Sequence, residues 1–176
     1  MKVKMKYVVL PLISTVVIFL DQLTKYWTVS RFKLGETLTV IPGFFSITYI
    51  QNKGAAFGLL SSADPSFRIP FFLIVPIVAL LSIGYVFLKL SEKDIRLAIA
   101  LSLVIAGAIG NLIDRLNLGY VVDFLDFHWQ WRYHFPAFNV ADSAICIGVG
   151  LIMLDLFVQE GNSKKEGSQV NVSPSL

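Results

Sequence analysis

The chain has 176 residues, enough for one modest domain, and 55% of them are hydrophobic while only 15% are charged. A soluble domain of this size has too much surface for its volume to hide so much apolar material, and the mean hydropathy is +0.68. The net charge of +3 comes from scattered basic residues, which excludes nucleic acid as a partner. We therefore expect an integral membrane protein.

Four apolar runs are long enough to cross a bilayer core, which takes roughly 20 helical residues. The first run follows Lys2, Lys4 and Lys6 and resembles a signal peptide, but no small-residue cleavage site follows it, so we expect an uncleaved helix. The lysines before it place both termini in the cytoplasm. The expected spans are 5–29, 67–88, 95–114 and 140–158, within one membrane-embedded domain over 1–160 that has outer loops at 30–66 and 115–139.

The polar segment 161–176 follows the last apolar run. It is rich in Ser, Asn, Lys and Gly and contains few residues that could bury apolar surface. We therefore expect it to be a disordered cytoplasmic tail.

Both outer loops show strand patterns. Apolar and β-branched residues over 37–41 and 44–50 flank Pro42-Gly43, which predicts a hairpin. Aromatic residues alternate with polar ones from Phe127 to Phe135, and a period of two predicts one strand with an aromatic face. Aromatic rings favour the headgroup level of a bilayer, although packing against the protein is an alternative. The predicted fold is mainly α, with four transmembrane helices and a small β-sheet on the outer membrane surface.

Small residues spaced four apart occur in two of the spans. Ala106 and Gly110 lie in the third span, and Ala144 and Gly148 lie in the fourth. This spacing lets a neighbouring helix approach closely. We expect both helices to take part in tight packing.

Several ionisable residues lie near the outer ends of the spans, where they are costly and suggest a functional site. Asp21 and Lys25 are four apart on one helix, which places them on one face as an ion pair. Asn111, Asp114 and Arg115 end the third span. A purely structural role, as a salt bridge and as polar helix-end groups, is an alternative for both sets.

Two further aspartates differ from these. Asp123 stands in an apolar stretch without a nearby basic residue, and Asp142 begins the fourth helix, where Asn139 could act as N-cap. Structural roles at a strand end and at a helix cap are open alternatives. If the two carboxylates meet, they would share one proton, and the pair could act as general base and general acid in peptide hydrolysis.

Other catalytic schemes fit the sequence less well. It has neither a Gly-x-Ser-x-Gly motif nor a His-Glu-x-x-His motif, and His128 and His134 are too far apart for a typical zinc pair. Cys146 is the one cysteine, and burial in mid-membrane would make it a poor nucleophile. We expect neither a metal nor a cofactor.

Five motifs in a fixed order resemble the bacterial lipoprotein signal peptidases, the type II signal peptidases. The resemblance extends from about residue 5 to residue 158. Each motif alone is weakly specific, but five in order across four spans are highly specific. The motifs are Asp21-Gln-Leu-Thr-Lys25, Asn52-Lys-Gly-Ala-Ala-Phe-Gly58, Gly110-Asn-Leu-Ile-Asp-Arg115, Val121-Val-Asp-Phe124 and Phe138-Asn-Val-Ala-Asp-Ser143.

This resemblance implies an aspartic endopeptidase of the bacterial inner membrane, with its active site near the outer face. It would remove the signal peptide from diacylglyceryl-modified prolipoproteins by cleaving just before the lipidated cysteine, without a cofactor. Its catalytic pair falls on Asp123 and Asp142, and its β-cradle agrees with the predicted strands. The supporting or substrate-binding residues fall on Asp21, Lys25, Asn52, Gly54, Asn111, Asp114, Arg115 and Asn139.

The expected partners are the lipid-modified prolipoprotein and the membrane lipids, and we expect a monomer. The Gly/Ala segment from Gly54 to Gly58 could bend over the site as a lid. A small transporter is a rival interpretation, but no carboxylate lies in mid-span and no inverted repeat is found. A non-enzymatic membrane scaffold is another, and it would tolerate substitution of both aspartates.

Overall fold

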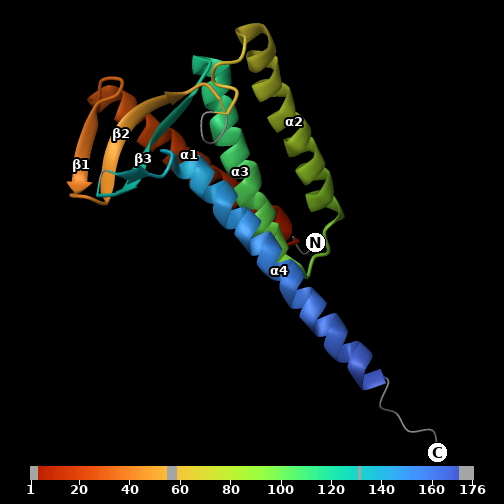
Figure 1. Cartoon of the computed structure of the whole chain (residues 1–176). Helices are drawn as coiled ribbons and strands as arrows, with labels where there is room; N and C mark the ends of the chain where they lie inside the picture. The colour runs from red at the N-terminus through yellow and green to blue at the C-terminus, as the bar shows by residue number, and fades with distance from the viewer. Residues whose placement is uncertain (1–3, 55–58, 131, 171–176) are drawn as a thin grey trace, which may run out of the picture.

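The structure is a computed structural model that describes residues 4–54, 59–130 and 132–170, with side chains described as far as residue 158. Along the chain, the elements are a helix, a hairpin, two helices, a second hairpin and a last helix (Figure 1). The helices are α1 (Lys6–Arg31), α2 (Pro65–Lys89), α3 (Ile95–Leu118) and α4 (Val140–Val170). The strands are β1 (Thr37–Ile41), β2 (Phe45–Asn52), β3 (Val121–Trp129) and β4 (Tyr133–His134).

All four helices are long and apolar enough to cross a membrane, as the sequence predicted. Their ends follow local chemistry. The Asp64 side chain accepts a hydrogen bond from Ser66 N–H at 2.8 Å and caps α2, whose first residue is Pro65. Helix α3 stops at Gly119, whose φ of 77° is the left-handed conformation that commonly ends a helix.

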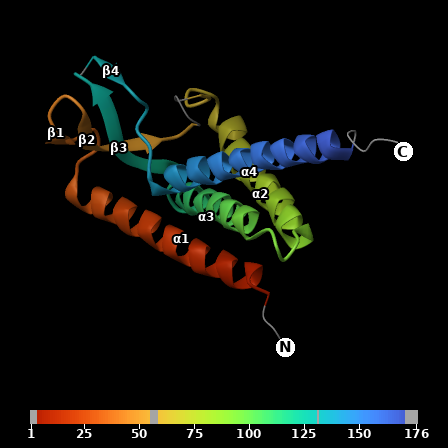
Figure 2. The same ribbon diagram turned by 90° about the horizontal axis from the view of Figure 1, so that it is seen from below.

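Helix α3 lies at the centre of the bundle and contacts the other three helices (Figure 2). Small residues allow this packing: a Cβ atom on Gly107 would collide with the Ala141 carbonyl oxygen, and one on Gly148 would lie 2.7 Å from the Ala100 carbonyl oxygen. The expected close approach at the small residues of both helices is confirmed, since Ala106 and Ala144 are buried as well.

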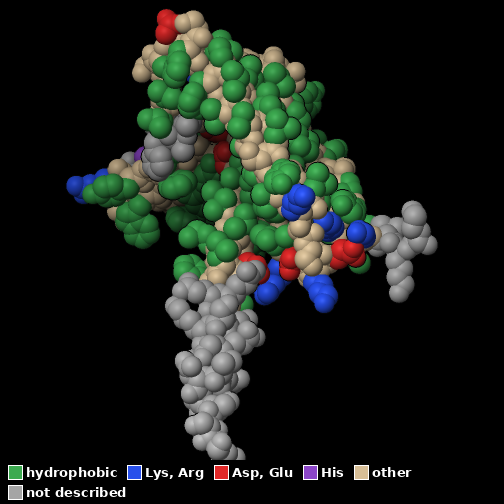
Figure 3. All heavy atoms as spheres, turned by 90° about the vertical axis from the view of Figure 1, so that its right-hand side faces the viewer, with side chains coloured by type: hydrophobic (Ala, Val, Ile, Leu, Met, Phe, Trp, Pro, Cys, Tyr) green, Lys and Arg blue, Asp and Glu red, His purple; other side chains and the backbone are tan. Residues whose placement is uncertain are grey.

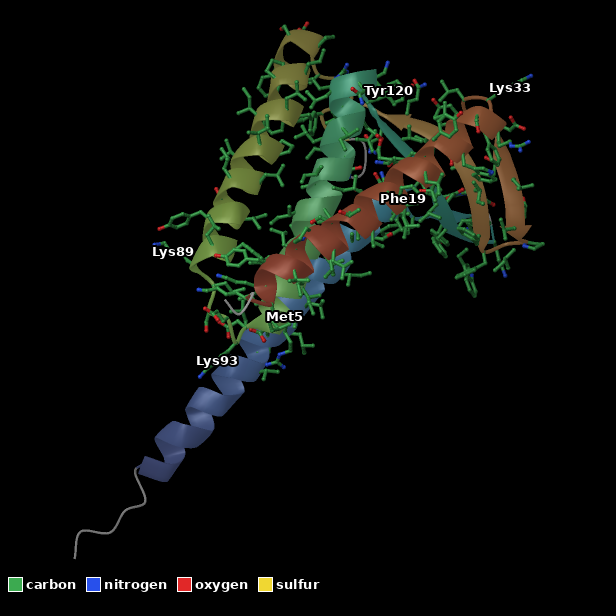
Figure 4. All side chains as sticks on the ribbon, turned by 180° about the vertical axis from the view of Figure 1, so that it is seen from behind. Met5, Phe19, Lys33, Lys89, Lys93 and Tyr120 are labelled. Carbon is green, nitrogen blue, oxygen red and sulfur yellow. The ribbon has the colours of Figure 1, made fainter. Side chains whose placement is uncertain are left out.

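The surface over the helices is mostly hydrophobic, and charged side chains gather at one end of it (Figure 3). Met5, Lys89 and Lys93 lie at that end, whereas Lys33 and Tyr120 lie at the other, near the sheet (Figure 4). An exposed ion pair joins Lys4 to Glu92, and a second pair joins the exposed Arg96 to the buried Asp155. This asymmetry gives the bundle one charged end and one end that carries the sheet.

The antiparallel sheet has the strand order β1-β2-β3-β4. Strands β1 and β2 form the predicted hairpin, with Gly43 at a φ of +75° in its turn. The single strand expected from Phe127 to Phe135 is wrong. Strand β3 ends at Trp129 and the chain folds back, so that His128 pairs with His134 and Trp129 with Tyr133.

Periodicity could not reveal this turn. In a hairpin with a three-residue loop, each residue pairs with one of the same odd or even number, so the alternation continues unchanged through the turn. Phe135 N–H donates to the Phe127 carbonyl at 2.8 Å, which keeps the aromatic positions on one face. Trp129, Tyr133 and Phe135 are exposed on the second hairpin. Their contact with the bilayer stays a prediction.

The expected disordered tail also differs from the structure, in which α4 continues through residues 161–170. Lys, Glu and Gln in 159–166 are good helix formers, and extending an existing helix needs no new nucleus. Residues 171–176 lie outside the described part of the chain.

The helix packing predicts a difference between two glycines. Gly107→Ala should separate α3 from α4 and cost about 1–3 kcal/mol of stability, because the added methyl group meets backbone that cannot move away. Gly150→Ala is the matched control, since a Cβ atom there meets nothing within 4 Å. Thermal unfolding in detergent micelles measures both variants. An unchanged Tm for Gly107→Ala would contradict this packing.

Candidate active site

A cleft of about 860 Å³ lies where the sheet meets the ends of α3 and α4. Asp123 and Asp142 both line it, so the two aspartates singled out from the sequence face one space. Both polar and apolar side chains line the cleft. The lining residues are Ile50, Gln51, Asn52, Lys53, Ser61, Asn111, Arg115, Val121, Asp123, Phe135, Pro136, Ala137, Phe138, Asp142, Ser143 and Cys146.

Asp123 lies in β3 and is only 2% exposed. Its carboxylate accepts one hydrogen bond from Asn139 Nδ2 at 2.7 Å and another from Asn52 Nδ2 at 2.9 Å. Both donors are neutral amides that come from different elements. They orient the carboxylate without giving it a charged partner.

Asp142 lies in the first turn of α4, and Asn139 is the N-cap of that helix. The Asp142 N–H donates to Asn139 Oδ1 at 2.9 Å, and the Asn139 N–H donates back to Asp142 Oδ2 at 3.2 Å. This reciprocal pair is a capping box with Asp142 at its third position. Asn111 Nδ2 donates to the other carboxylate oxygen of Asp142 at 2.7 Å.

Asn139 therefore contacts both aspartates. Its side-chain nitrogen donates to Asp123, while its backbone nitrogen donates to Asp142. The cap interpretation of Asp142 and its location in the cleft are both correct, because one residue serves the helix and the cleft together.

Beside the cleft lies a buried ion cluster. Lys25 Nζ is 2.9 Å from Asp21 Oδ2 and 3.1 Å from Asp114 Oδ2, and all three side chains are almost fully buried. Lys25 also donates to Asn111 Oδ1 at 2.9 Å. Because two donors point at this oxygen, from Lys25 and from Asn139, the Asn111 amide must turn its NH₂ group toward Asp142.

The cluster also fixes backbone on both sides of the cleft. Asp21 Oδ1 accepts the Ala141 N–H at 2.9 Å, which satisfies a free donor of the first turn of α4. Asp114 Oδ2 accepts the Val122 N–H at 3.0 Å, next to Asp123. The ends of α1 and α3 thereby position the two segments that hold the aspartates.

Sequence reasoning missed Gln22. Its side-chain nitrogen donates to Asp21 Oδ2 at 3.1 Å and to Asp114 Oδ1 at 3.0 Å, so it bridges the two carboxylates. A search for ionisable groups could not find it because an amide has no charge. Its position directly after Asp21, inside an apolar span, was the available signal.

Arg115 contacts three parts of the structure. Its guanidinium donates to the Gly54 carbonyl at 3.3 Å and to the Asn111 carbonyl at 3.4 Å, and it lies over the ring of Phe72 in α2. Phe72 was not anticipated from the sequence. The predicted lid falls mostly on residues 55–58, which lie outside the described residues.

Burial, and after it the nearby charge of Asp142, raise the pKa of Asp123 from an ordinary 3.8 to about 7. The hydrogen bonds from Asn52 and Asn139 oppose this rise. A proton at this site is therefore held and released near neutral pH, as a general acid or base requires.

The histidines and the cysteine lie differently from what the sequence suggested. His128 and His134 are cross-strand neighbours, with His128 3.1 Å from the Ser46 hydroxyl and His134 3.2 Å from Asp126. Neither histidine lines the cleft. Cys146 does, and the expected burial of its thiol is wrong, because one helical turn beyond Asp142 places it on the open wall.

The fold and the site together define a class: a membrane protein of four long apolar helices in which a small extramembrane sheet and two helix ends hold a pair of carboxylates in one cleft. A sequence profile of the signal peptidase (SPase) II family matches residues 13–158, and the chain belongs to this family.

Individual proteins are similar over most of the chain. The lipoprotein signal peptidase of Syntrophotalea carbinolica is 51% identical over 146 residues, which cover 83% of this chain and 89% of that protein. The lipoprotein signal peptidase of Geobacter metallireducens is 46% identical over 163 residues, 93% of this chain and 99% of that protein. A bacterial membrane enzyme solved by the in meso method at 2.3 Å has a TM-score of 0.77 and 42% identity, covering 86% of this chain and 88% of that one.

The raised pKa of Asp123 predicts a pH-dependent stability difference. In the unfolded chain this carboxyl group ionises near 3.8, but in the folded protein it ionises near 7, so the folded state binds more protons between these values. The contribution of Asp123 to stability is complete below the lower value and is lost as the pH rises through the higher one. Asp123→Asn should therefore raise Tm relative to wild type at pH 8.5 more than at pH 4.

The measurement is the Tm difference between Asp123→Asn and wild type across this pH range in one detergent. Comparing the two proteins cancels the titration of the groups that do not interact with Asp123. A difference that is the same at both ends of the range would contradict the raised pKa.

Proposed function

We propose that this chain is an aspartic endopeptidase that removes the signal peptide from diacylglyceryl-modified prolipoproteins by cleaving just before the lipidated cysteine. One observation carries the proposal: Asp123 and Asp142 line the same cleft and are joined through Asn139. The substrate class is supported by the lipoprotein signal peptidases to which the chain is similar.

In the proposed reaction, Asp123 and Asp142 share one proton. The ionised member takes a proton from a water molecule, whose oxygen attacks the scissile carbonyl carbon, while the protonated member gives its proton to the carbonyl oxygen. The tetrahedral intermediate then collapses, the C–N bond breaks, and a proton passes to the leaving amine. The pair titrates as a unit, so neither role belongs permanently to one residue.

The neighbouring side chains suit this chemistry because the donors nearest the pair are amides. Asn52, Asn111 and Asn139 orient the carboxylates but cannot accept or release their proton. Lys25 is kept one step away, since it reaches Asn111 rather than Asp142. A cation directly on the pair would hold both carboxylates ionised and leave no proton to donate.

The location of the cleft suits a substrate anchored in a membrane. It lies where the sheet meets the helix ends, so a lipid-anchored peptide could reach it without leaving the bilayer. We propose that this end faces the outside of the bacterial inner membrane and that both termini are cytoplasmic. Lys89 and Lys93 lie at the opposite end (Figure 4), which agrees with the positive-inside rule.

The remaining points concern the partners and Gly54. The protein is proposed to act as a monomer, with membrane lipids around its apolar helices and without a cofactor. Gly54 is tightly packed, because a Cβ atom there would collide with the Leu59 carbonyl oxygen. This contact helps to fix the backbone of Gly54, whose N–H donates to Asn52 Oδ1.

The catalytic pair can be tested by isosteric substitution. Asp123→Asn and Asp142→Asn should each lower the rate of cleavage of a diacylglyceryl-modified precursor by about 10²–10⁴-fold or more, because an amide cannot transfer the proton. The rate is measured with purified protein in micelles. Asp126→Asn is the matched control: it lies on the same strand as Asp123 but pairs with His134 outside the cleft, and it should keep the wild-type rate. Normal turnover by either cleft variant would refute the assignment.

The pH dependence gives a second test. Cleavage should fall as the pH rises above about 7, the raised pKa at Asp123, because the pair then loses the proton that it must donate. The Asn52 hydrogen bond stabilises the ionised form and lowers this pKa, so Asn52→Ala should move the fall in rate to higher pH by about one unit. The pH profile of kcat measures the shift, and a movement to lower pH would contradict the proposed role of the pair.

A further inference from the structure

Among the described residues, helix α2 buries two side chains, Phe72 about two turns after its start and Phe87 in its last turn. Phe87 lies at the charged end of the bundle, where Lys6 Nζ is 5.8 Å from its ring centre. Phe72 lies toward the sheet end and is 9% exposed. The two phenylalanines thus attach the same helix to the rest of the protein at opposite ends.

The ring of Phe72 is occupied by a cation. The guanidinium carbon of Arg115 lies 5.3 Å from the ring centre, within the range of a cation–π interaction. The hydrogen bonds of the same guanidinium, to the carbonyls of Gly54 and Asn111, are long at 3.3 and 3.4 Å. The aromatic face is therefore a substantial part of what fixes the orientation of Arg115.

Both of these carbonyls belong to segments that hold the aspartates. On one side, the Gly54 N–H donates to Asn52 Oδ1 at 2.9 Å, and Asn52 Nδ2 donates to Asp123. On the other side, Asn111 donates to Asp142. A shift of the Arg115 guanidinium would be felt by one amide donor of each carboxylate.

We propose that Phe72 is a positioning residue for the cleavage reaction, which orients the Asp123 and Asp142 carboxylates through Arg115. It touches neither aspartate and does not line the cleft. This inference rests on the proposed function, because cleavage is its main readout. It makes α2 part of the active site at a distance rather than a passive membrane span.

The test compares three variants in the full-length protein. Phe72→Leu keeps apolar volume but removes the aromatic face, and kcat for a diacylglyceryl-modified precursor should fall by about three- to ten-fold with little change in KM. Phe72→Tyr keeps the face and should restore kcat. Phe87→Leu is the matched control, since it also removes a buried ring of α2 that faces a cation, but at the other end of the helix. It should lower Tm and leave kcat unchanged.

A double-mutant cycle tests whether Phe72 acts through Arg115. The effects of Phe72→Leu and Arg115→Lys on kcat should be less than additive, because both remove the same contact. Full additivity, failure of Phe72→Tyr to restore kcat, an unchanged kcat for Phe72→Leu, or an equal loss in Phe87→Leu would each overturn the proposal.

A readout that needs no cleavage separates this inference from the proposed function. The Tm difference between a protein with Asp123→Asn and the same protein with Asp123 intact changes with pH, and the pH of this transition reports the pKa of Asp123. In the Phe72→Leu background this transition should move to higher pH, because the Asn52 hydrogen bond is weakened, and an unmoved transition would overturn the proposal. If the wild-type protein cleaves no lipidated precursor, the proposed function fails while this measurement still decides the role of Phe72.

Discussion

The structure depends on one buried lysine. Lys25 is only 3% exposed, and its charge is balanced because Asp21 and Asp114 both reach it. An unpartnered charge at this depth would cost several kcal/mol, so α1 and α3 are held at a fixed separation and rotation. The same two carboxylates accept the N–H groups of Ala141 and Val122. Satisfying one cation therefore places the first turn of α4 and the start of β3 side by side.

As a consequence, neither of the cations near the site forms an ion pair with the two cleft carboxylates among the described contacts. Both positive groups also contact the neutral residue Asn111: Lys25 donates to its side-chain oxygen, and Arg115, which lines the cleft, donates to its backbone carbonyl. The carboxylates that face the cleft are left with amide donors and with each other. This arrangement keeps a proton available in a site that is otherwise rich in ionised groups, and the fold bears the cost by burying carboxylates that would be better solvated in water.

Much of this arrangement could be predicted from the sequence, because length and hydropathy define membrane spans and i, i+4 spacing defines shared helix faces. The ion pair of Asp21 with Lys25 and the cap at Asn139 followed from local spacing alone. The turn within the second hairpin did not, because alternation has the same form in a strand and in a hairpin with a three-residue loop. Gln22 and Phe72 were missed because each meets a charged residue of another helix, and no local pattern records which neutral side chain will meet a distant charge.

The second hairpin separates the two aspartates in the sequence: Asp123 lies near the start of its first strand, and Asp142 lies in the first turn of the final helix. During synthesis the chain therefore contains Asp123 and the whole ion cluster before Asp142 has been made. Asn139, which joins the pair, also starts α4, so the carboxylates are brought together by the same event that forms this helix. A nascent or truncated chain that lacks its fourth helix would be inert, and hydrolytic competence would arise only once the whole bundle is in the bilayer.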